Sequence, residues 1–380
     1  MNTTKLFELV SPVKGGGQVL RLLFALLFSL ANQGFRSVSL SCIRAIRPTP
    51  GLHAQAMAGI ETIRQLFPAL VFEGAELSSQ TLKILFPEDL VSGAFSAVEA
   101  ITINIGTAGS TALVLQALLG VLPFGTTATV IGGTNVDYAP PTDHVELVLA
   151  PILALWGIKL THDTLKRGVF PKGGGMTRFS IDRTGLKPFQ LTERGEITRV
   201  LIRVVSASAK LDITSFVKAV IANNSKVLHK DLVVSEFICD PLMTNKTQIL
   251  VVVETSSGSR LSESIILQNL KKEIPESDEA VNKFLARISG ILTTHATFDE
   301  HTADQVLLFM ALATNEAATK PDCGHDGISS IRVENDVVGV DHMVSAMEIL
   351  HALMPNIKFE VIPDPETSTF IIRFFPKTTV

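Results

Sequence analysis

The feature that most constrains this chain is a threefold repeat of one pattern of predicted elements. In each copy a helix is followed by a strand, a second helix and two strands, and a strand over Ala97–Ile105 also precedes the second copy. The first helices of the three copies are Gln18–Asn32, Ser110–Leu122 and Thr302–Ala313. Three βαβαββ units of this kind predict an α/β protein in which each unit packs helices on a sheet in two layers.

The repeated pattern of predicted elements is interrupted between residues 197 and 292, where Lys, Glu, Ser and Asn become more frequent. Two strands and two helices are predicted there, over Ile197–Ser206, Gln248–Glu254, Ile213–Ala222 and Leu261–Ile274. We therefore predict a smaller α/β domain over 197–292, inserted into a large domain of three units over 1–196 and 293–380.

Composition excludes several classes of protein. Hydrophobic residues make up 46% of the 380 residues and charged residues 18%, which is enough apolar surface for a large core and too much for a mainly disordered chain. The net charge of −4 excludes a global basic field, so any nucleic acid must bind through a local patch.

Neither a membrane span nor a secretory signal is expected. The most apolar run, Leu22–Ala31, is far shorter than the about 20 residues that cross a bilayer, so it predicts a buried core helix. The glycines after Lys14 do not fit a signal peptide. Three cysteines, Cys42, Cys239 and Cys323, form no disulfide framework and indicate a reducing, intracellular compartment.

The first helix of each unit begins at a special sequence, namely Gly15-Gly16-Gly17-Gln18, Gly106-Thr107-Ala108-Gly109-Ser110 and His301-Thr302-Ala303-Asp304-Gln305. Helix N-termini present free N–H groups and partial positive charge to an anion, and glycine permits close approach to the backbone. Taken singly, each glycine cluster fits equally well a tight turn between a strand and a helix. Their recurrence in all three units favours one shared anion site. No GxxxxGK[ST] motif is present, which excludes a P-loop.

Two further segments carry cations beside rigid turns. Arg44 and Arg47 lie just before a Pro-rich turn. Two guanidinium groups at such a place can bind phosphates through bidentate hydrogen bonds, or they can form a solvated pair on the surface. Arg167 and Lys172 lie beside three consecutive glycines, in either a phosphate-binding loop or a plain hairpin connection. Asp143 is well placed to cap a helix predicted over Asp143–Trp156.

Taken together, these motifs resemble those of the RNA 3′-terminal phosphate cyclases. The carrying segments are GGGQVLR (15–21), IRAIRPTPGL (43–52), GTAGSTALVLQ (106–116), GGTNVDYAPP (132–141), RGVFPKGGG (167–175) and HTADQ (301–305). The resemblance covers essentially the whole chain, and GGTNVDYAPP is closer to eukaryotic members. Enolpyruvyl transferases share the repeated unit, but the inserted domain and HTADQ argue against that class.

The resemblance implies a ligase-type reaction that uses ATP and a divalent metal, Mg²⁺ or Mn²⁺, on RNA with a 3′-terminal phosphate. A histidine takes the adenylyl group from ATP, passes it to the RNA phosphate, and the 2′-OH closes a 2′,3′-cyclic phosphate. The position of that histidine corresponds here to His342, at the start of a predicted helix over Val344–Met354.

The resemblance also implies two sets of binding residues. Those for the nucleotide are Gln18, Gln116, Pro140, His301, Asp304 and Gln305. Those for RNA phosphates are Arg21, Arg44, Arg47, Gln55, Arg167 and Lys172.

Three places depart from the family pattern, one of which is Met343-Val344-Ser345, where family members usually have a Thr-rich segment after the histidine. Lys14 replaces a glutamate that helps to hold the metal and nucleotide, so the metal ligands remain unassigned, and His301 replaces a tyrosine of the adenine region. Two functions therefore stay open, an active cyclase and a catalytically impaired relative that acts as an RNA-binding or ribosome-biogenesis factor. Location is expected to be nuclear (nucleoplasm) in a eukaryote and cytoplasmic otherwise.

Overall fold

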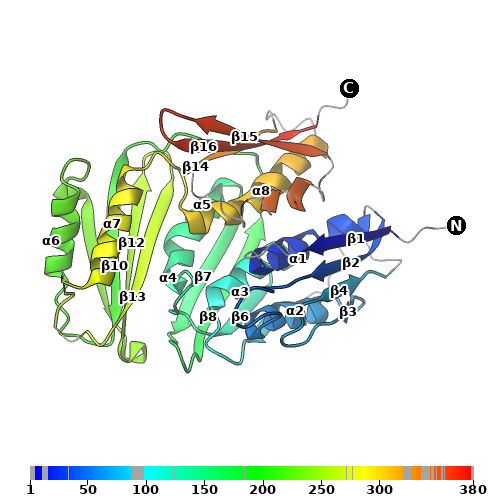
Figure 1. Cartoon of the computed structure of the whole chain (residues 1–380), viewed down its shortest axis with the longest axis horizontal. Helices are drawn as coiled ribbons and strands as arrows, with labels where there is room; N and C mark the ends of the chain where they lie inside the picture. Colours follow the sequence, from blue (N-terminus) through cyan, green and yellow to red (C-terminus); the bar gives the residue numbers. More distant parts are fainter. Residues whose placement is uncertain are drawn as a thin grey trace.

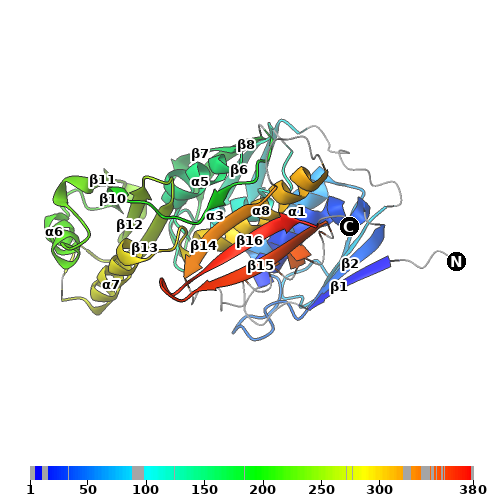
Figure 2. The ribbon, with the colours of Figure 1, turned by 90° about the horizontal axis from the view of Figure 1, so that it is seen from above.

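The structure is a computed structural model, and it describes residues 5–10, 16–32, 34–87, 98–123, 125–183, 185–270, 272–275, 277–319, 327–334, 343, 346–347, 349–351, 354 and 356–377. Four four-stranded sheets organise the chain (Figure 1). Three of them are built around a common group of helices, and the fourth forms one end of the molecule (Figure 2). The predicted α/β class is confirmed.

The first three sheets share one topology. Their strands are β1 (Lys5–Val10), β2 (Phe35–Ser41), β3 (Val71–Glu73) and β4 (Leu82–Leu85); β5 (Ala100–Asn104), β6 (Thr127–Gly132), β7 (Ile158–Lys166) and β8 (Gly175–Arg183); and β9 (Gln190–Leu191), β14 (Ser329–Glu334), β15 (Ile357–Asp364) and β16 (Thr369–Pro376). The orders are β1-β2-β4-β3, β5-β6-β8-β7 and β9-β14-β16-β15. In each, the first two strands pair in parallel and the other pairs are antiparallel.

This topology confirms the repeat and adds two leading strands, β1 and β9, that the sequence analysis did not locate. The two-residue strand β9 precedes the inserted segment, and its parallel partner β14 follows it. The insertion therefore interrupts the third unit between its first strand and its first helix.

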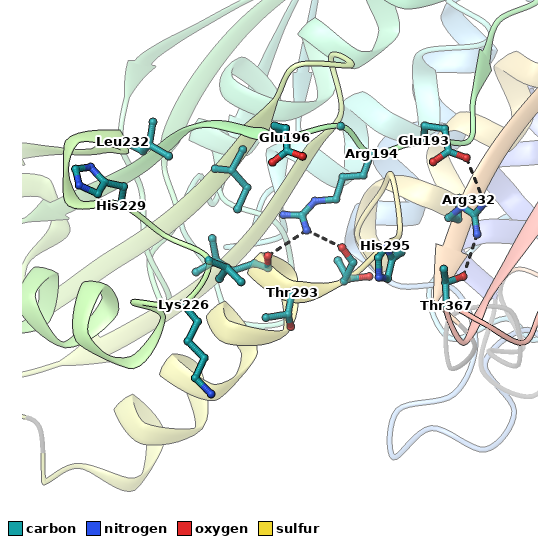
Figure 3. A pocket seen from close by; sticks show the side chains of 15 residues that line it. Glu193, Arg194, Glu196, Lys226, His229, Leu232, Thr293, His295, Arg332 and Thr367 are labelled. Atoms are coloured by element: carbon teal, nitrogen blue, oxygen red, sulfur yellow. Dashed lines mark hydrogen bonds and ion pairs between the residues drawn. The ribbon is translucent and has the colours of Figure 1, made fainter.

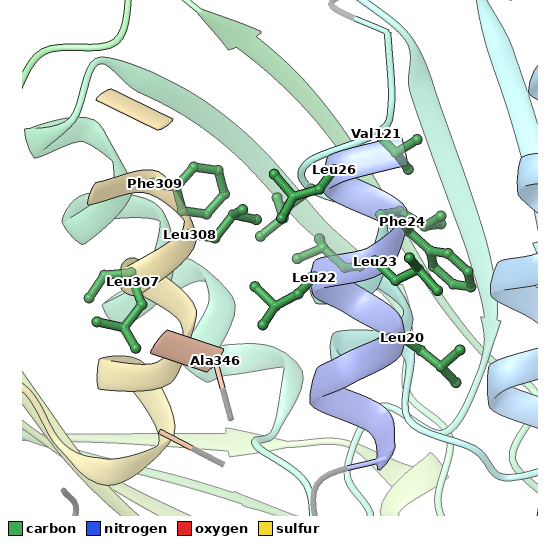
Figure 4. Packing of buried hydrophobic residues seen from close by; sticks show 14 of the residues in the cluster. Leu20, Leu22, Leu23, Phe24, Leu26, Val121, Leu307, Leu308, Phe309 and Ala346 are labelled. Carbon is green, nitrogen blue, oxygen red and sulfur yellow. The ribbon is translucent and has the colours of Figure 1, made fainter. Parts of the chain in front are cut away.

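The first helices of the three units, α1 (Gly16–Asn32), α3 (Thr111–Leu118) and α8 (Glu300–Thr319), form the centre of the core. Leu22, Leu23 and Leu26 of α1 are completely buried. Figure 4 shows Leu308 and Phe309 of α8 pointing toward Leu26 of α1, and all three belong to one buried cluster. As predicted, the apolar run of α1 is a core helix, and no helix among the described residues is long and apolar enough to cross a membrane.

The second helix of the second unit is interrupted. It consists of α4 (Thr142–His144), the π-helical turn η1 (Val145–Leu149) and α5 (Ala150–Leu155). Pro151 has no N–H to donate to the carbonyl of Leu147, four residues earlier. That carbonyl accepts a hydrogen bond of 2.6 Å from the Arg260 guanidinium of the inserted segment instead. The second helix of the first unit, α2 (Ala54–Leu66), is continuous.

The inserted segment forms the fourth sheet, of order β11-β10-β12-β13. Its elements are β10 (Ile197–Ser206), α6 (Thr214–Asn223), β11 (Val233–Cys239), β12 (Lys246–Thr255), β13 (Arg260–Gln268) and α7 (Glu279–Thr293). Alternate residues of β10 and β12 belong to different cores. Val200 and Val251 pack in a core shared with α6 and α7, whereas Leu201 and Val252 join the main core. Because both faces are buried, these strands read as continuous apolar runs. The predicted domain boundaries stay a prediction.

The helix predicted over Leu261–Ile274 is wrong. Residues 260–268 form β13, which pairs antiparallel with β12 after a turn at Gly258 with a φ of +88°. The apolar residues of this run occur at spacings that a helix and a half-buried strand share, and a short run does not separate the two. The tight turn and the available edge of β12 cause residues 260–268 to form a strand instead of a helix.

The close packing among the first helices predicts that Gly→Ala substitution has opposite effects on stability at two glycines. A Cβ at Gly120 would lie 2.4 Å from the Cβ of Ala25 in α1 and 3.3 Å from Cδ2 of Leu308 in α8, whereas a Cβ at Gly290 in α7 would meet nothing within 4 Å. Gly120→Ala should lower the free energy of unfolding by about 1–3 kcal/mol through overpacking. Gly290→Ala should raise it by about 0.5–1 kcal/mol through helix propensity. Urea denaturation of both variants measures the difference, and equal effects would contradict the close packing at Gly120.

Candidate active site

The N-terminal parts of the three central helices open into one pocket of about 990 Å³. Arg21 of α1, Ser110 at the start of α3 and Asp304 of α8 all line it. The predicted convergence of the three units on one site therefore matches the geometry. The predicted site residues that line this pocket are Arg21, Arg44, Arg47, Gln55, Gln116, Pro140, His301, Asp304 and Gln305.

An ion pair joins the first and third units at the pocket wall. The Arg21 guanidinium lies 3.3 Å from a carboxylate oxygen of Asp304, and the Gln305 amide donates to the other oxygen at 2.6 Å. Burial lowers the pKa of Arg21, and the charge of Asp304 opposes that shift. Arg21 thus has a protein partner as well as access to the pocket.

Gln116 is the clearest sign of a ligand. Its side chain is 2% exposed, lines the pocket, and has no hydrogen-bond partner among the described residues at either the amide oxygen or the amide nitrogen. Leaving a buried polar group unsatisfied costs about 1–3 kcal/mol. Such a group at a pocket wall is expected to pair with a bound molecule, which agrees with the nucleotide contact predicted for it.

The glycines at the start of α3 have a structural reason to be glycine. A Cβ at Gly109 would lie 2.8 Å from Ile105, and one at Gly133 would lie 2.5 Å from the carbonyl oxygen of Ala108. The helix start is therefore pressed against the end of β6, which supports the tight-turn interpretation at these positions. Ser110 caps α3, since its hydroxyl accepts the N–H of Leu113 at 3.3 Å.

Two arginines beside the pocket have no acidic partner. Arg44 and Arg47 both line it, and neither forms an ion pair with any residue that the structure describes. Burial and then the charge of Arg47 lower the pKa of Arg44, as expected for two guanidinium groups close together. Gln55 completes this side, its amide oxygen accepting the N–H of Ser110 at 3.0 Å. An anion would relieve the repulsion between the two charges.

The structure does not bring Arg167 or Lys172 into the pocket. Arg167 is 8% exposed and forms two hydrogen bonds with Asp143, at 2.7 and 2.9 Å. Lys172 is exposed on the turn between β7 and β8. The cap predicted at Asp143 is wrong, because Pro141 occupies the N-cap and Asp143 lies one residue inside the helix. Burial would raise the pKa of Asp143, but Arg167 and then Arg203 hold it below its ordinary value.

Several predicted positions lie outside the described residues. They include His342 and Lys14, and only the backbone of Gln18 is described, in the first turn of α1. The described part of the chain contains no cluster of three or more His, Cys, Asp or Glu residues that could hold a metal. Metal binding therefore stays a prediction, and no step is assigned to it.

A second pocket, of about 770 Å³, lies between the inserted segment and the third sheet (Figure 3). Its two arginines are already bound by other groups of the protein. Arg194 donates to the carbonyl oxygens of Ile291, Leu292 and Thr294 at the end of α7, at 2.6–3.1 Å. Arg332 is bound by Asp364 and by Thr367. We therefore interpret this pocket as the junction between the inserted segment and the third unit.

Comparison with known proteins decides the family. The family model described as RNA 3′-terminal phosphate cyclase matches residues 13–361. The chain belongs to this family. A protein of that name from Hyperthermus butylicus is 32% identical over 92% of this chain and 91% of its own length. One from Caldivirga maquilingensis is 33% identical over 79% of this chain and 83% of its own length, and one from Desulfurococcus amylolyticus is 29% identical over 92% of both.

The cyclase-family pocket also contains residues that the sequence analysis did not single out. His53, at the start of α2, lines it, and burial followed by the charge of Arg44 lowers its pKa to about 4. Asp137, Tyr138 and Phe170 line the pocket from the two loops beside β6 and β8. Tyr138 is the single tyrosine of the chain and lies in a Pro-rich loop. That rarity was the one feature of its composition that could have drawn attention to it.

The arginines of this family member include one with a buried acidic partner and others that line the pocket, which predicts unequal effects of mutation on stability. Arg167→Ala leaves the buried Asp143 carboxylate without its bidentate partner and should cost about 3–5 kcal/mol of unfolding free energy. Arg47→Ala, at an exposed position, should change it by less than about 0.5 kcal/mol. Denaturant unfolding measures both. An Arg167→Ala variant as stable as the wild type would show that the pair with Asp143 contributes little.

Buried histidines predict a loss of stability in mild acid. Burial lowers the pKa of His144 to about 4, with smaller effects of Asp299, which raises it, and His301, which lowers it. Between about pH 6.5 and 4 the unfolded chain therefore binds more protons than the folded one, so unfolding free energy falls as the pH falls. In His144→Gln, the loss of unfolding free energy between pH 7 and pH 4 should be smaller than in the wild type by up to about 3 kcal/mol. Urea unfolding from pH 7 downward tests it, with the exposed His229→Gln as control; an unchanged slope in His144→Gln would contradict the assignment.

Proposed function

We propose that this protein converts an RNA 3′-terminal phosphate into a 2′,3′-cyclic phosphodiester in an ATP-dependent reaction. The observation that carries the proposal is the pocket itself. It combines three helix N-terminal regions, the unpartnered amide of Gln116, and two arginines, Arg44 and Arg47, without acidic partners among the described residues. These groups are suited to polyphosphate and RNA phosphate. Family membership and the names of the relatives support the same activity.

In the proposed reaction, an imidazole nitrogen of His342 attacks the α-phosphorus of ATP, and the bond to the leaving pyrophosphate breaks. An oxygen of the RNA 3′-phosphate then takes the adenylyl group, which breaks the P–N bond to the histidine. Finally the vicinal 2′-OH attacks the RNA phosphorus, loses its proton, and AMP leaves. Each step exchanges one bond to phosphorus for another, and the 2′-OH is at very high effective concentration because it is on the same ribose.

The pocket residues fit distinct parts of this chemistry. Arg44, Arg47 and the amide nitrogen of Gln55 are suited to the RNA phosphate, while Gln116, Pro140, His301 and Gln305 are suited to the nucleotide. Met343, the residue that follows His342 in the sequence, lines the pocket with a buried side chain. That adjacency supports the proposal for His342, whose own position lies outside the described residues.

The alternative is a catalytically impaired relative that binds RNA or a ribosome-assembly partner. The observation that favours it is Lys14, a cation where the family resemblance implies a metal-binding glutamate. The two functions differ in one property, the formation of a covalent nucleotide adduct. The three relatives compared with this chain come from archaea, so the nuclear option has no support, and an intracellular location stays a prediction.

Adenylylation tests the proposed nucleophile directly. With α-labelled ATP and Mg²⁺ or Mn²⁺, the wild type should form an acid-labile labelled adduct and cyclise 3′-phosphorylated RNA. His342→Ala should abolish both, by several orders of magnitude, because a missing nucleophile is not replaced by a neighbour. His325, in the polar segment Cys323-Gly324-His325, is the competing histidine near the C-terminus, and His325→Ala serves as the matched control that should keep both activities.

Lys14→Glu separates the two functions. It should raise cyclase activity or lower the metal concentration required, because it restores an acid at that position. If the wild type forms no adduct at any metal concentration and Lys14→Glu does not restore one, the binding-factor alternative holds. A wild-type adduct that persists in His342→Ala would keep the enzyme and reject His342.

A further inference from the structure

Two exposed aromatic side chains line the mouth of the pocket. Tyr138 is fully exposed, at 105% of its reference area, and Phe170 is 61% exposed. Large apolar side chains are ordinarily removed from water, and a pair of them beside a polar pocket marks a binding surface. The proposed reaction assigns no role to either side chain.

The two aromatic residues are held on one scaffold. Tyr138 lies on the loop after β6 and Phe170 on the turn after β7, and a bridge between Asn135 and Val169 joins these segments. The N–H of Thr134 donates to the carbonyl of Gly168 at 2.8 Å, and the N–H of Gly168 donates to the hydroxyl of Thr134 at 3.0 Å. Both aromatics are therefore presented from segments that are fixed to each other.

The same scaffold is anchored to the floor of the pocket. A Cβ at Gly173, in the turn that carries Phe170, would lie 2.8 Å from the Cα of Ala108 at the start of α3. Tyr138 itself has a φ of +61°, in the left-handed region that residues with side chains rarely adopt. The loop therefore holds an exposed aromatic side chain in a backbone conformation that costs free energy.

The part of the pocket wall that carries Tyr138 and Phe170 differs in charge from the part that carries Arg44 and Arg47. Asp137, next to Tyr138, also lines the pocket and would repel a phosphate, whereas Arg44 and Arg47 would attract one. A nucleobase is neutral, offers a flat π-face to an aromatic ring, and stacks with little dependence on sequence. The distribution of groups therefore fits a nucleotide whose phosphate and base contact different parts of the wall.

We propose that Tyr138 and Phe170 form a stacking platform for the bases at the 3′ end of single-stranded RNA, while Arg44 and Arg47 hold its terminal phosphate. This inference rests on the proposed function, because it takes RNA with a 3′-phosphate as the substrate. It adds that substrate affinity depends on unpaired bases near the end, with little preference among them.

Fluorescence anisotropy with a labelled single-stranded RNA of about ten nucleotides ending in a 3′-phosphate tests the platform. Tyr138→Ala and Phe170→Ala should each weaken binding by about 5- to 100-fold. Tyr138→Phe should keep wild-type affinity, because stacking needs the ring and not the hydroxyl. Leu242→Ala, a similarly exposed apolar position (43%) on the inserted segment, is the control and should have no effect.

A second RNA with abasic sugars at its two terminal positions identifies the contacted groups. The wild type should bind it as weakly as the double variant Tyr138→Ala/Phe170→Ala binds the intact RNA, and the double variant should lose nothing further. Unchanged affinity of both alanine variants for the intact RNA would overturn the proposal. So would a loss of ATP affinity with RNA binding intact, since the ring would then serve the adenine of ATP.

The labelled-ATP adduct keeps this test independent of the proposed function. Adduct formation does not require RNA, so Tyr138→Ala and Phe170→Ala should form it at the wild-type level. A wild-type protein without the adduct would refute the proposed chemistry, and the binding comparison would still decide the platform. A wild-type protein that cyclises RNA, with alanine variants that bind it equally well, would refute the platform alone.

Discussion

The structure depends on the need to bury α1 on all sides. From Leu20 to Leu30 its described side chains are almost entirely apolar, with Arg21 the exception, and Leu22, Leu23, Leu26 and Leu27 have no exposed surface. Burying each leucine contributes about 1.5–3 kcal/mol relative to leaving it in water. A single βαβαββ unit leaves one face of such a helix open. The helix is covered only when α3 and α8 pack beside it, so the stability of the first unit requires the other two.

That packing also creates the pocket. Because the three central helices come together, the groups at their N-terminal ends meet, and Arg21 of the first unit pairs with Asp304 of the third. A site made of three units exists only in the assembled fold. In a chain with a net charge of −4, Arg44 and Arg47 supply this pocket with a local positive region that has no acidic partner among the described residues.

Arginines with structural roles attach the inserted segment to this frame. Arg260 donates to the carbonyl of Leu147, to which Pro151 has no N–H to offer, and Arg203 pairs with Asp143 and Glu146. Arg194 binds the last carbonyls of α7. Guanidinium groups suit these places because one planar group can satisfy several acceptors at once. The sheet of the insertion is consequently covered on one face by its own helices and on the other by the main core.

The sequence by itself determined the α/β class, the three repeats and most elements of the repeated units, because these follow from local periodicity, turn residues and apolar spacing. Its motifs also favoured one shared anion site at the helix starts, and the family resemblance added Arg44 as a phosphate-binding residue. Only the tertiary structure decided which cations are used internally: Arg167 and Arg44 both stand beside rigid turns, but Asp143 and Asp240 approach Arg167 from distant parts of the chain. Likewise, residues 260–268 became a strand because β12 offered an edge, and the loop that carries Tyr138 is hydrogen-bonded to the turn at Gly168. Such outcomes depend on partners far apart in sequence, which local patterns do not specify.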